Sequence, residues 1–315
     1  MKKIPFIIVI GLSSVLLSDG YCYGQKIPDS AGYKSALTRI LDFRQALNTT
    51  KYGRNDAVGK YAQVNGIKMY YEIYGKGKPL LIICGNGGSI SGDVMQIPFF
   101  SRNFKVIVAD TRGQGKTIYN SDSLTYSLLT EDYNALLNYL HIDSAYVVGQ
   151  SDGAIIGLML AARHPDKVKM LAALSPNIRW DSTLYPAMDT LWHEYVGWLK
   201  KAVKPGNEEA LKNWKEAYMG VYHPNMADSE LHHIKAEVMV MTSDRDLVRL
   251  SHIIEIFRNI SKSELCVLPG STHFVQVLNP VLFNNTVYRF FQEPFYAPNS
   301  IDYMKEARRR RMAKQ

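Results

Sequence analysis

From residue 80 onward, short apolar segments alternate along the chain with longer segments of helical periodicity. Strands that are apolar at every position are typical of a parallel sheet whose two faces are both covered by helices. The apolar segments are Leu80–Cys84, Val106–Ala109, Ala145–Val148, Met170–Leu174, Val238–Met241 and Leu265–Leu268. The helical segments include Leu128–Leu140, Ala154–Arg163, Ser251–Ile260 and Val281–Phe291. This alternation predicts an α/β fold with helices on both faces of a mostly parallel sheet.

A β-hairpin is predicted before the first of these strands. The segments Tyr61–Val64 and Ile67–Tyr74 have strand-like composition, and Asn65 and Gly66 separate them. Asparagine followed by glycine is favoured in two-residue hairpin turns, because both positions require positive φ. With this hairpin the predicted sheet has eight strands.

One interval between strands is too long for a single crossover helix. About sixty residues separate the predicted strand Met170–Leu174 from the next one, and all four tryptophans of the chain fall between them. Connections of this length carry secondary structure of their own. We therefore predict a helical cap at residues 178–235, inserted into a core domain made of residues 60–177 and 236–293.

Residues 1–24 have the layout of a secretory signal peptide. Lys2 and Lys3 form a basic start, Ile4–Leu17 is mostly apolar, and small and polar residues follow. The apolar stretch is too short for a stable membrane span. We therefore expect an exported protein, periplasmic or secreted, whose mature chain opens with a polar lead-in at residues 25–59.

The net charge of +8 is unevenly distributed along the chain. Residues 305–315 contain six basic residues and one acidic residue, and residues 1–24 add one positive charge, which leaves +2 for residues 25–304. A nearly neutral body argues against a nucleic-acid-binding face. The basic tail at residues 294–315 is a candidate for weak contact with an anionic surface, although a solvated chain end is the commoner explanation.

The strongest local motif is G-Q-S-D-G at residues 149–153, between the strand Ala145–Val148 and a helical segment. A serine at a sharp turn from strand to helix projects from the carboxyl edge of the sheet, and glycines on both sides let neighbouring backbone approach. A serine hydroxyl becomes a nucleophile when a base takes its proton and another group fixes that base. Ser151 is therefore a candidate nucleophile.

Candidates for the base and its partner follow the last two predicted strands. Asp244 and Asp246 come after Val238–Met241, and His273 comes after Leu265–Leu268. Together with the serine, these residues follow three different strands. The order serine, aspartate, histidine along the chain is typical of one particular fold.

With these elements the chain resembles the α/β-hydrolase fold superfamily over about residues 60–293. Two further turns support the resemblance: C-G-N-G-G-S at residues 84–89 and D-T-R-G-Q-G-K-T at residues 110–117. In the family the first turn usually reads His-Gly-x-Gly-Gly, and Cys84 stands here in place of the histidine. The aspartate that follows the serine is similar to the biphenyl-hydrolase-like group, which includes valacyclovir hydrolase.

The resemblance implies catalytic roles for three residues. Ser151 is the nucleophile, His273 is the general base, and Asp246 is the acid that orients the histidine. Asp246 is preferred to Asp244 because the family pattern Gly-x-x-Asp maps onto residues 243–246, although serine replaces the glycine and Asp244 stays open. This chemistry needs no metal or organic cofactor.

The resemblance also suggests how the rest of the site is built. By analogy, the backbone N–H groups of Asn86 and Asp152 form the oxyanion hole. The carboxylate of Asp152 has two explanations: recognition of a cationic substrate group, or simple stabilisation in the first turn of a helix. Trp180 and Trp192 are candidates for lining an apolar pocket under the cap, with packing within the cap as the alternative.

Two other sequence patterns resemble a nucleotide site and a metal site but lack the required residue spacing. The segment 113–117 resembles the end of a phosphate-binding loop, but the position that requires glycine holds Asp110. Histidines and acidic residues crowd the end of the cap without the spacing of a metalloenzyme, namely His223, Asp228, Glu230, His232 and His233. Neither a nucleotide site nor a metal site is predicted.

The sequence therefore predicts a serine hydrolase that cleaves a carboxylic ester or a related acyl bond of a small molecule through an acyl-enzyme. Because this fold supports many reactions, amidase or aminopeptidase activity and hydrolysis of lactones or C–C bonds remain alternatives. A ligand-binding protein with vestigial catalysis is the alternative from another class.

Overall fold

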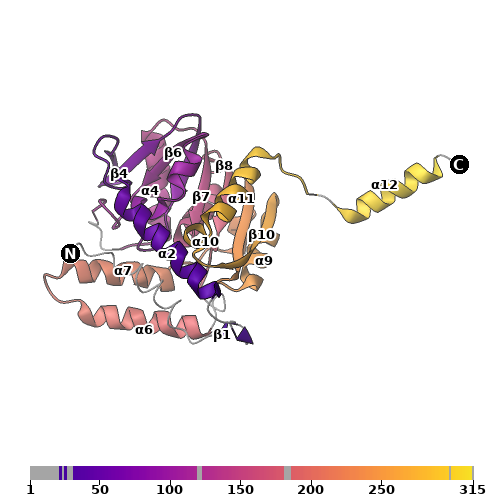
Figure 1. Cartoon of the computed structure of the whole chain (residues 1–315). Coiled ribbons are helices and arrows are strands. Elements are labelled where there is room, and N and C mark those ends of the chain that lie inside the picture. Colours follow the sequence, from indigo (N-terminus) through magenta and orange to yellow (C-terminus); the bar gives the residue numbers. More distant parts are fainter. Residues whose placement is uncertain are drawn as a thin grey trace.

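A computed structural model describes residues 21–22, 25–26, 31–118, 123–180, 186–297 and 299–313 of the chain (Figure 1). The strands are β1 (Tyr21–Cys22), β2 (Gln25–Lys26), β3 (Lys60–Val64), β4 (Ile67–Tyr74), β5 (Lys78–Ile83), β6 (Phe104–Ala109), β7 (Ala145–Gln150), β8 (Val168–Leu174), β9 (Glu237–Arg245) and β10 (Ser263–Thr272). The helices are α2 (Ala31–Thr49), the 3₁₀ helix η1 (Ile90–Asp93), α3 (Ile97–Phe100), α4 (Tyr126–Tyr139), α5 (Asp152–Arg163), α6 (Pro186–Ala202), α7 (Glu208–Tyr222), α8 (Asp228–Leu231), α9 (Leu250–Asn259), α10 (Val275–Leu278), α11 (Pro280–Gln292) and α12 (Ser300–Met312).

Strands β3 to β10 form one eight-stranded sheet in the order β10-β9-β8-β7-β5-β6-β4-β3. Neighbouring strands from β10 to β6 are parallel, whereas β4 is antiparallel to both β3 and β6. The β3–β4 hairpin turns at Asn65 and Gly66, whose φ values are +41° and +76°. The predicted mostly parallel eight-stranded sheet and its hairpin are confirmed.

Two hydrophobic cores lie on the two faces of the sheet. Successive residues of β7 alternate between them: Val147 packs with α4, α5 and α9, whereas Tyr146 and Val148 pack with α3 and α11. Side chains of a strand point alternately to opposite faces, so a sheet covered on both faces needs apolar residues at every position. This explains why the central strands are continuously apolar in the sequence.

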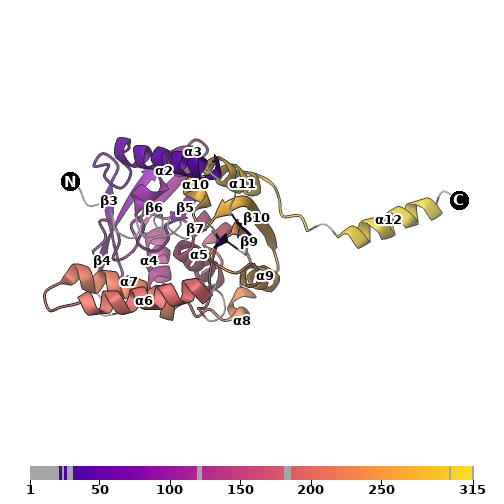
Figure 2. The same cartoon turned by 60° about the horizontal axis from the view of Figure 1, so that its bottom comes forward.

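The predicted cap segment contains α6, α7 and α8, between β8 and β9, and α8 packs on α5 and α9 of the core. Helices α6 and α7 lie side by side and share a small hydrophobic core (Figures 1 and 2). Its buried members are Val196, Leu199, Ala217 and Val221. The segment that carries α6 and α7 begins and ends at one place, because Arg179 pairs with Asn225 in an isolated antiparallel bridge and the N–H of Met226 donates to the carbonyl of Ile178.

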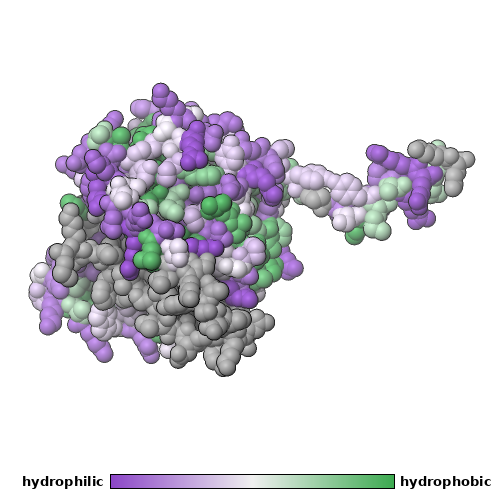
Figure 3. All heavy atoms as spheres, in the orientation of Figure 1, coloured by the Kyte–Doolittle hydropathy of each residue, from purple (hydrophilic) through white to green (hydrophobic). Residues whose placement is uncertain are grey.

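The two ends of the described chain differ in their contacts with the body. Helix α2 packs on it: Ile40 and Phe43 are buried, and Nη1 of Arg39 donates to the carbonyl of Leu278 in α10. The basic tail forms helix α12, which buries no residue and projects away from the body (Figures 1 and 3). The predicted signal peptide lies almost wholly outside the described residues, and no helix within them is long and apolar enough to cross a membrane.

Candidate active site

Ser151 lies at the turn between β7 and α5. Its backbone has φ +53° and ψ −118°, a conformation that residues other than glycine seldom adopt. The N–H of Ser151 donates to the carbonyl of Leu174 at the end of β8, and the carbonyl of Ser151 accepts a hydrogen bond from the N–H of Ala154. The neighbouring strand and the first turn of α5 therefore hold the serine in this turn.

The glycines of the motif allow the turn to pack tightly. A Cβ atom on Gly149 would lie 2.3 Å from the carbonyl oxygen of Gly153, and one on Gly153 would lie 2.1 Å from the carbonyl oxygen of Ile83. Both obstacles are backbone atoms, which cannot rotate away as a flexible side chain can. A side chain at Gly149 would therefore push the first turn of α5 away from β7, and one at Gly153 would displace the serine turn from β5.

His273 and Asp246 meet directly beyond the ends of β10 and β9. Nδ1 of His273 lies 2.8 Å from Oδ1 of Asp246, and both side chains are buried. Burial alone raises the pKa of Asp246, but the charge of His273 and hydrogen bonds from neighbouring groups outweigh burial and hold this pKa below its usual value. A carboxylate on Nδ1 selects the imidazole tautomer whose Nε2 accepts a proton.

Asp244 occupies a different place. Its carboxylate accepts hydrogen bonds from the N–H groups of Gly270 and Ser271, each 3.0 Å long, in the bend of β10 that precedes the histidine. Asp246 therefore contacts His273, whereas Asp244 stabilises the loop that carries the histidine.

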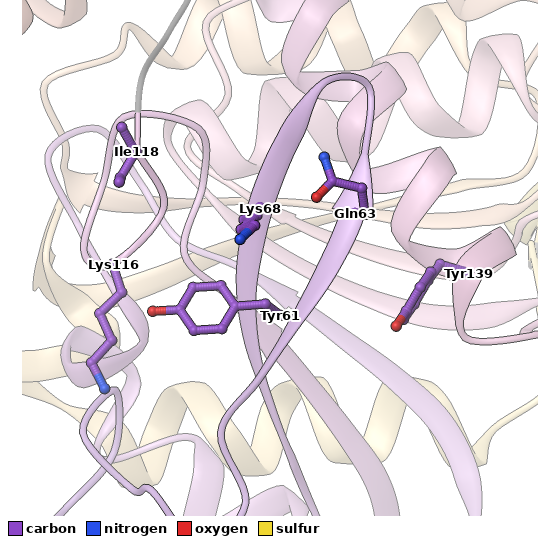
Figure 4. A pocket seen from close by; sticks show the side chains of 6 residues that line it. All are labelled: Tyr61, Gln63, Lys68, Lys116, Ile118 and Tyr139. Carbon is purple, nitrogen blue, oxygen red and sulfur yellow. The ribbon is translucent and has the colours of Figure 1, made fainter.

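One small cavity collects most of the predicted site residues. It has a volume of about 60 Å³ and is lined by Asn86, Ser151, Asp152, Asn177, Trp180, Trp192, Gly220, Leu247, Val248 and His273. A larger hollow of about 440 Å³ lies by the β3–β4 hairpin (Figure 4) and is lined by Tyr61, Gln63, Lys68, Lys116, Ile118 and Tyr139. Because the larger hollow contains none of the predicted residues, we place the candidate site in the smaller cavity.

The loop after β5 brings Asn86 to this cavity. Gly87 in this loop has φ +64°, and the N–H of Gly88 donates to the carbonyl of Gly85. Nδ2 of Asn86 donates to the backbone carbonyl of Glu216 in α7, 3.2 Å away. The loop is therefore hydrogen-bonded to the cap as well as packed beside Ser151.

The architecture agrees with a family comparison. Residues 78–227 match the family model described as alpha/beta hydrolase fold. The chain has the α/β-hydrolase fold. It is 26% identical over 254 residues to "Putative carbamate hydrolase RutD" of Caulobacter sp. (strain K31), an alignment that covers 70% of this chain and 95% of that protein.

Two solved α/β-hydrolase structures show the same architecture. A meta-cleavage product hydrolase from Pseudomonas fluorescens IP01 has a TM-score of 0.63 and 19% identity, and the match covers 76% of this chain and 99% of that one. An enol-lactonase from Burkholderia xenovorans LB400 has a TM-score of 0.61 and 22% identity, with 74% and 100% covered. At these identities the likeness concerns the fold.

Cys84 takes the place of the histidine usual in this α/β-hydrolase loop. Its Sγ donates to Oδ2 of Asp93 in η1, at 2.9 Å. Burial raises the pKa of the Cys84 thiol well above its usual value and raises the pKa of Asp93 to about 6. The thiol therefore stays protonated at neutral pH and links the loop to η1.

Asp152 directly follows the serine and faces the cavity. Burial raises the pKa of its carboxyl to about 6, while Tyr126, Asn86 and the charge of His273 counteract the rise. In the described part of the chain, Oδ2 of Asp152 is buried without a hydrogen bond of good geometry, although the hydroxyl of Tyr126 lies near enough to lower the pKa of the carboxyl. A buried acceptor without a partner is costly, so this carboxylate is a candidate for contact with a donor group of a ligand.

Two of the four tryptophans of the cap combine the two expected roles, because Trp180 and Trp192 also pack against the small core of the cap. Trp180 and Trp192 line the cavity and contact each other edge to face, with ring centroids 6.5 Å apart. Trp214 packs against the small core of the cap, and Trp198 is exposed and stacks on Tyr195. Half of the indoles therefore face the site.

Sequence reasoning missed several residues that the fold brings to the site. Ser175 and Asn177 follow β8, whereas Leu247 and Val248 follow Asp246. The available signal was their position, because residues just after parallel strands share the edge where ligands bind. Among the described residues, no group of three or more histidines, cysteines or acidic side chains is placed to hold a metal ion.

Proposed function

We propose that the protein is a serine hydrolase that cleaves a carboxylic ester or a related acyl bond through an acyl-enzyme. The supporting observation is that Ser151 and His273 line one cavity while the carboxylate of Asp246 is hydrogen-bonded to Nδ1 of His273. A nucleophile, a base and a group that orients the base are the parts that acyl transfer requires.

In the proposed reaction, Oγ of Ser151 attacks the acyl carbonyl while its proton passes to Nε2 of His273. The carbonyl oxygen becomes an oxyanion, which the backbone N–H groups of Asn86 and Asp152 stabilise. The imidazolium returns the proton to the leaving oxygen, and the acyl group remains on the serine. Water then attacks the acyl-enzyme with His273 as base, which releases the acid and restores the serine. Asp246 keeps Nδ1 protonated throughout.

The names of the relatives indicate more than one scissile bond, including a carbamate, a meta-cleavage product and an enol-lactone. Lactones and carbamates are acyl compounds that the same steps would hydrolyse, whereas amides and C–C bonds have poorer leaving groups. An ester is proposed because an alkoxide is expelled from the tetrahedral intermediate more readily than an amine or a carbanion, and it takes up the proton of His273 as it leaves as an alcohol.

A panel of p-nitrophenyl esters tests this proposal. Because the cavity beside Ser151 measures about 60 Å³, we expect kcat/KM for acetyl and butyryl esters to exceed that for the dodecanoyl ester about tenfold or more. The anilide with the same acyl group is the matched control for the bond. Faster turnover of the anilide, a lactone or a carbamate would reassign the bond, and no turnover together with no labelling of Ser151 would favour a ligand-binding protein.

A preference for amino-bearing substrates is a second proposal, and it rests on the unpartnered oxygen of Asp152. A second buried carboxyl reinforces the negative potential: Glu216 of α7 has its pKa raised to about 7, chiefly by burial, and the charge of Asp152 contributes. Lys212 is the cation near Glu216, with Nζ 3.8 Å from Oε1. An ammonium group in the substrate would supply both charge and donors.

The amine preference is tested with an α-amino acyl ester and its analogue without the amine. We expect the amino ester to react about tenfold faster at pH 7, where its amine is mostly an ammonium, as one hydrogen bond to a charged group predicts. Asp152 ionises above its pKa of about 6, so the preference should be lost at pH 5. Asp152→Asn keeps the backbone N–H and should remove the preference at pH 7, with Glu216→Gln as the comparison. Equal rates for the two esters at pH 7 would refute the proposal.

Export through residues 1–24 and contact of the tail with an anionic surface stay predictions from the sequence. In helix α12 the carboxylate of Glu306 accepts hydrogen bonds from Arg309 and Arg310. Pairing within the helix therefore offsets part of the positive charge that such a contact would use.

A further inference from the structure

Ser175 follows β8 in a conformation that serine seldom adopts. Its φ is +54°, within the left-handed region that favours glycine, and its side chain is fully buried. Its N–H donates to the carbonyl of Met241 in β9, at 2.8 Å. A glycine would relieve the backbone strain at this position, so the hydroxyl is the feature that requires explanation.

The hydroxyl of Ser175 contacts the carboxylate that holds the histidine. Its Oγ donates to Oδ2 of Asp246 over 2.5 Å, a short distance typical of hydrogen bonds to charged oxygens. The other donor to Oδ2 among the described contacts is the N–H of Ser243, at 3.4 Å. Oδ1, by contrast, receives the N–H groups of Leu247 and Val248 in addition to His273.

We propose that Ser175 is a positioning residue for the hydrolytic reaction, which fixes the carboxylate of Asp246 through Oδ2 so that Oδ1 stays aligned with His273. This inference rests on the proposed function. Without Ser175, Oδ2 would keep only the long hydrogen bond from the N–H of Ser243, and the carboxylate could rotate about its Cβ–Cγ bond and draw the imidazole with it. A buried hydroxyl on the second oxygen prevents that rotation and disperses part of the negative charge.

The test compares Ser175→Ala and Ser175→Gly with the wild type, by kcat/KM for the best p-nitrophenyl ester and by the rate of fluorophosphonate labelling between pH 5 and 9. For both variants we expect kcat to fall about tenfold with KM changed less than about twofold, since an interaction used in the transition state is lost. The acid limb of kcat/KM should move to higher pH, because a less dispersed carboxylate favours the imidazolium.

Strain and catalysis are separated by comparing the two variants. Glycine removes both the hydroxyl and the strain, so Ser175→Gly should melt at a higher temperature than Ser175→Ala while being equally impaired in catalysis. Ser263→Ala is the matched control, since this hydroxyl donates to the carbonyls of Phe257 and Ile260 at the opposite end of the sheet. It should keep the wild-type pH profile.

Failure of the inference and failure of the proposed function give different results. A folded wild type that the probe does not label would refute the proposed function itself. A labelled wild type, with Ser175→Ala and Ser175→Gly keeping its kcat and pH profile, would overturn only the role of Ser175. An active glycine variant beside an impaired alanine variant would also overturn it, because the backbone alone would then explain the effect.

Discussion

Replacing Ser151 with alanine should lower kcat for ester hydrolysis about a millionfold and abolish labelling by a fluorophosphonate, because loss of the nucleophile removes the acyl-enzyme route altogether. The turn itself should persist. It is held by the backbone N–H of Ser151 on the carbonyl of Leu174, which alanine retains. The measurements are steady-state kinetics and mass spectrometry of the labelled peptide.

The melting temperature and circular dichroism of Ser151→Ala provide its control. A folded variant that loses both activity and label supports the assignment of the nucleophile. A folded variant that still hydrolyses ester at the wild-type rate, or that takes the label on another residue, would show that the reaction occurs elsewhere.

Asp246→Asn should lower kcat about ten-thousandfold, whereas Asp244→Asn should lower it less than about threefold. The two aspartates are two residues apart, but their contacts differ. Asp246 accepts from Nδ1 of His273, while Asp244 accepts from two backbone N–H groups in the bend of β10. An amide opposite Nδ1 favours the tautomer that places the proton on Nε2, where it blocks general-base catalysis.

Asp244→Asn controls for the loss of a carboxylate that holds the loop of His273 without contacting the ring. Asp244→Asn should lower the melting temperature while leaving kcat nearly unchanged, because it weakens the loop that carries His273 but does not contact the imidazole ring. The assignment of the acid would be reversed if Asp244→Asn lost activity and Asp246→Asn kept it.

Much of the fold could be predicted because its determinants are local in sequence. The continuously apolar sequence of β7 predicts a strand buried on both faces, and Asn65 followed by Gly66 predicts a two-residue turn. The turn that carries Ser151 is equally local. Gly149 lets β7 lie close to the start of α5, and Gly153 lets the turn lie close to the adjacent β5. Each of these patterns specifies its own geometry.

The remaining parts of the site depend on contacts between distant segments. No local pattern around Ser175 shows that its hydroxyl reaches Asp246, which lies 71 residues away. Likewise, the placement of Trp192 on the cavity and of Trp198 on the surface, both in α6, follows from how α6 packs on α7. Such contacts arise from packing across the molecule, which residue spacing does not encode.

The hydrogen bond from Nδ2 of Asn86 to the carbonyl of Glu216 has a consequence for how this enzyme would diversify. The loop proposed to stabilise the oxyanion is hydrogen-bonded to α7, whose Gly220 lines the cavity beside Ser151. A cap taken from a relative would therefore change turnover together with selectivity, unless its helix offered a carbonyl at the same place. New specificities would be reached more readily by exchanging side chains such as Trp180 and Trp192 than by replacing the cap as a unit.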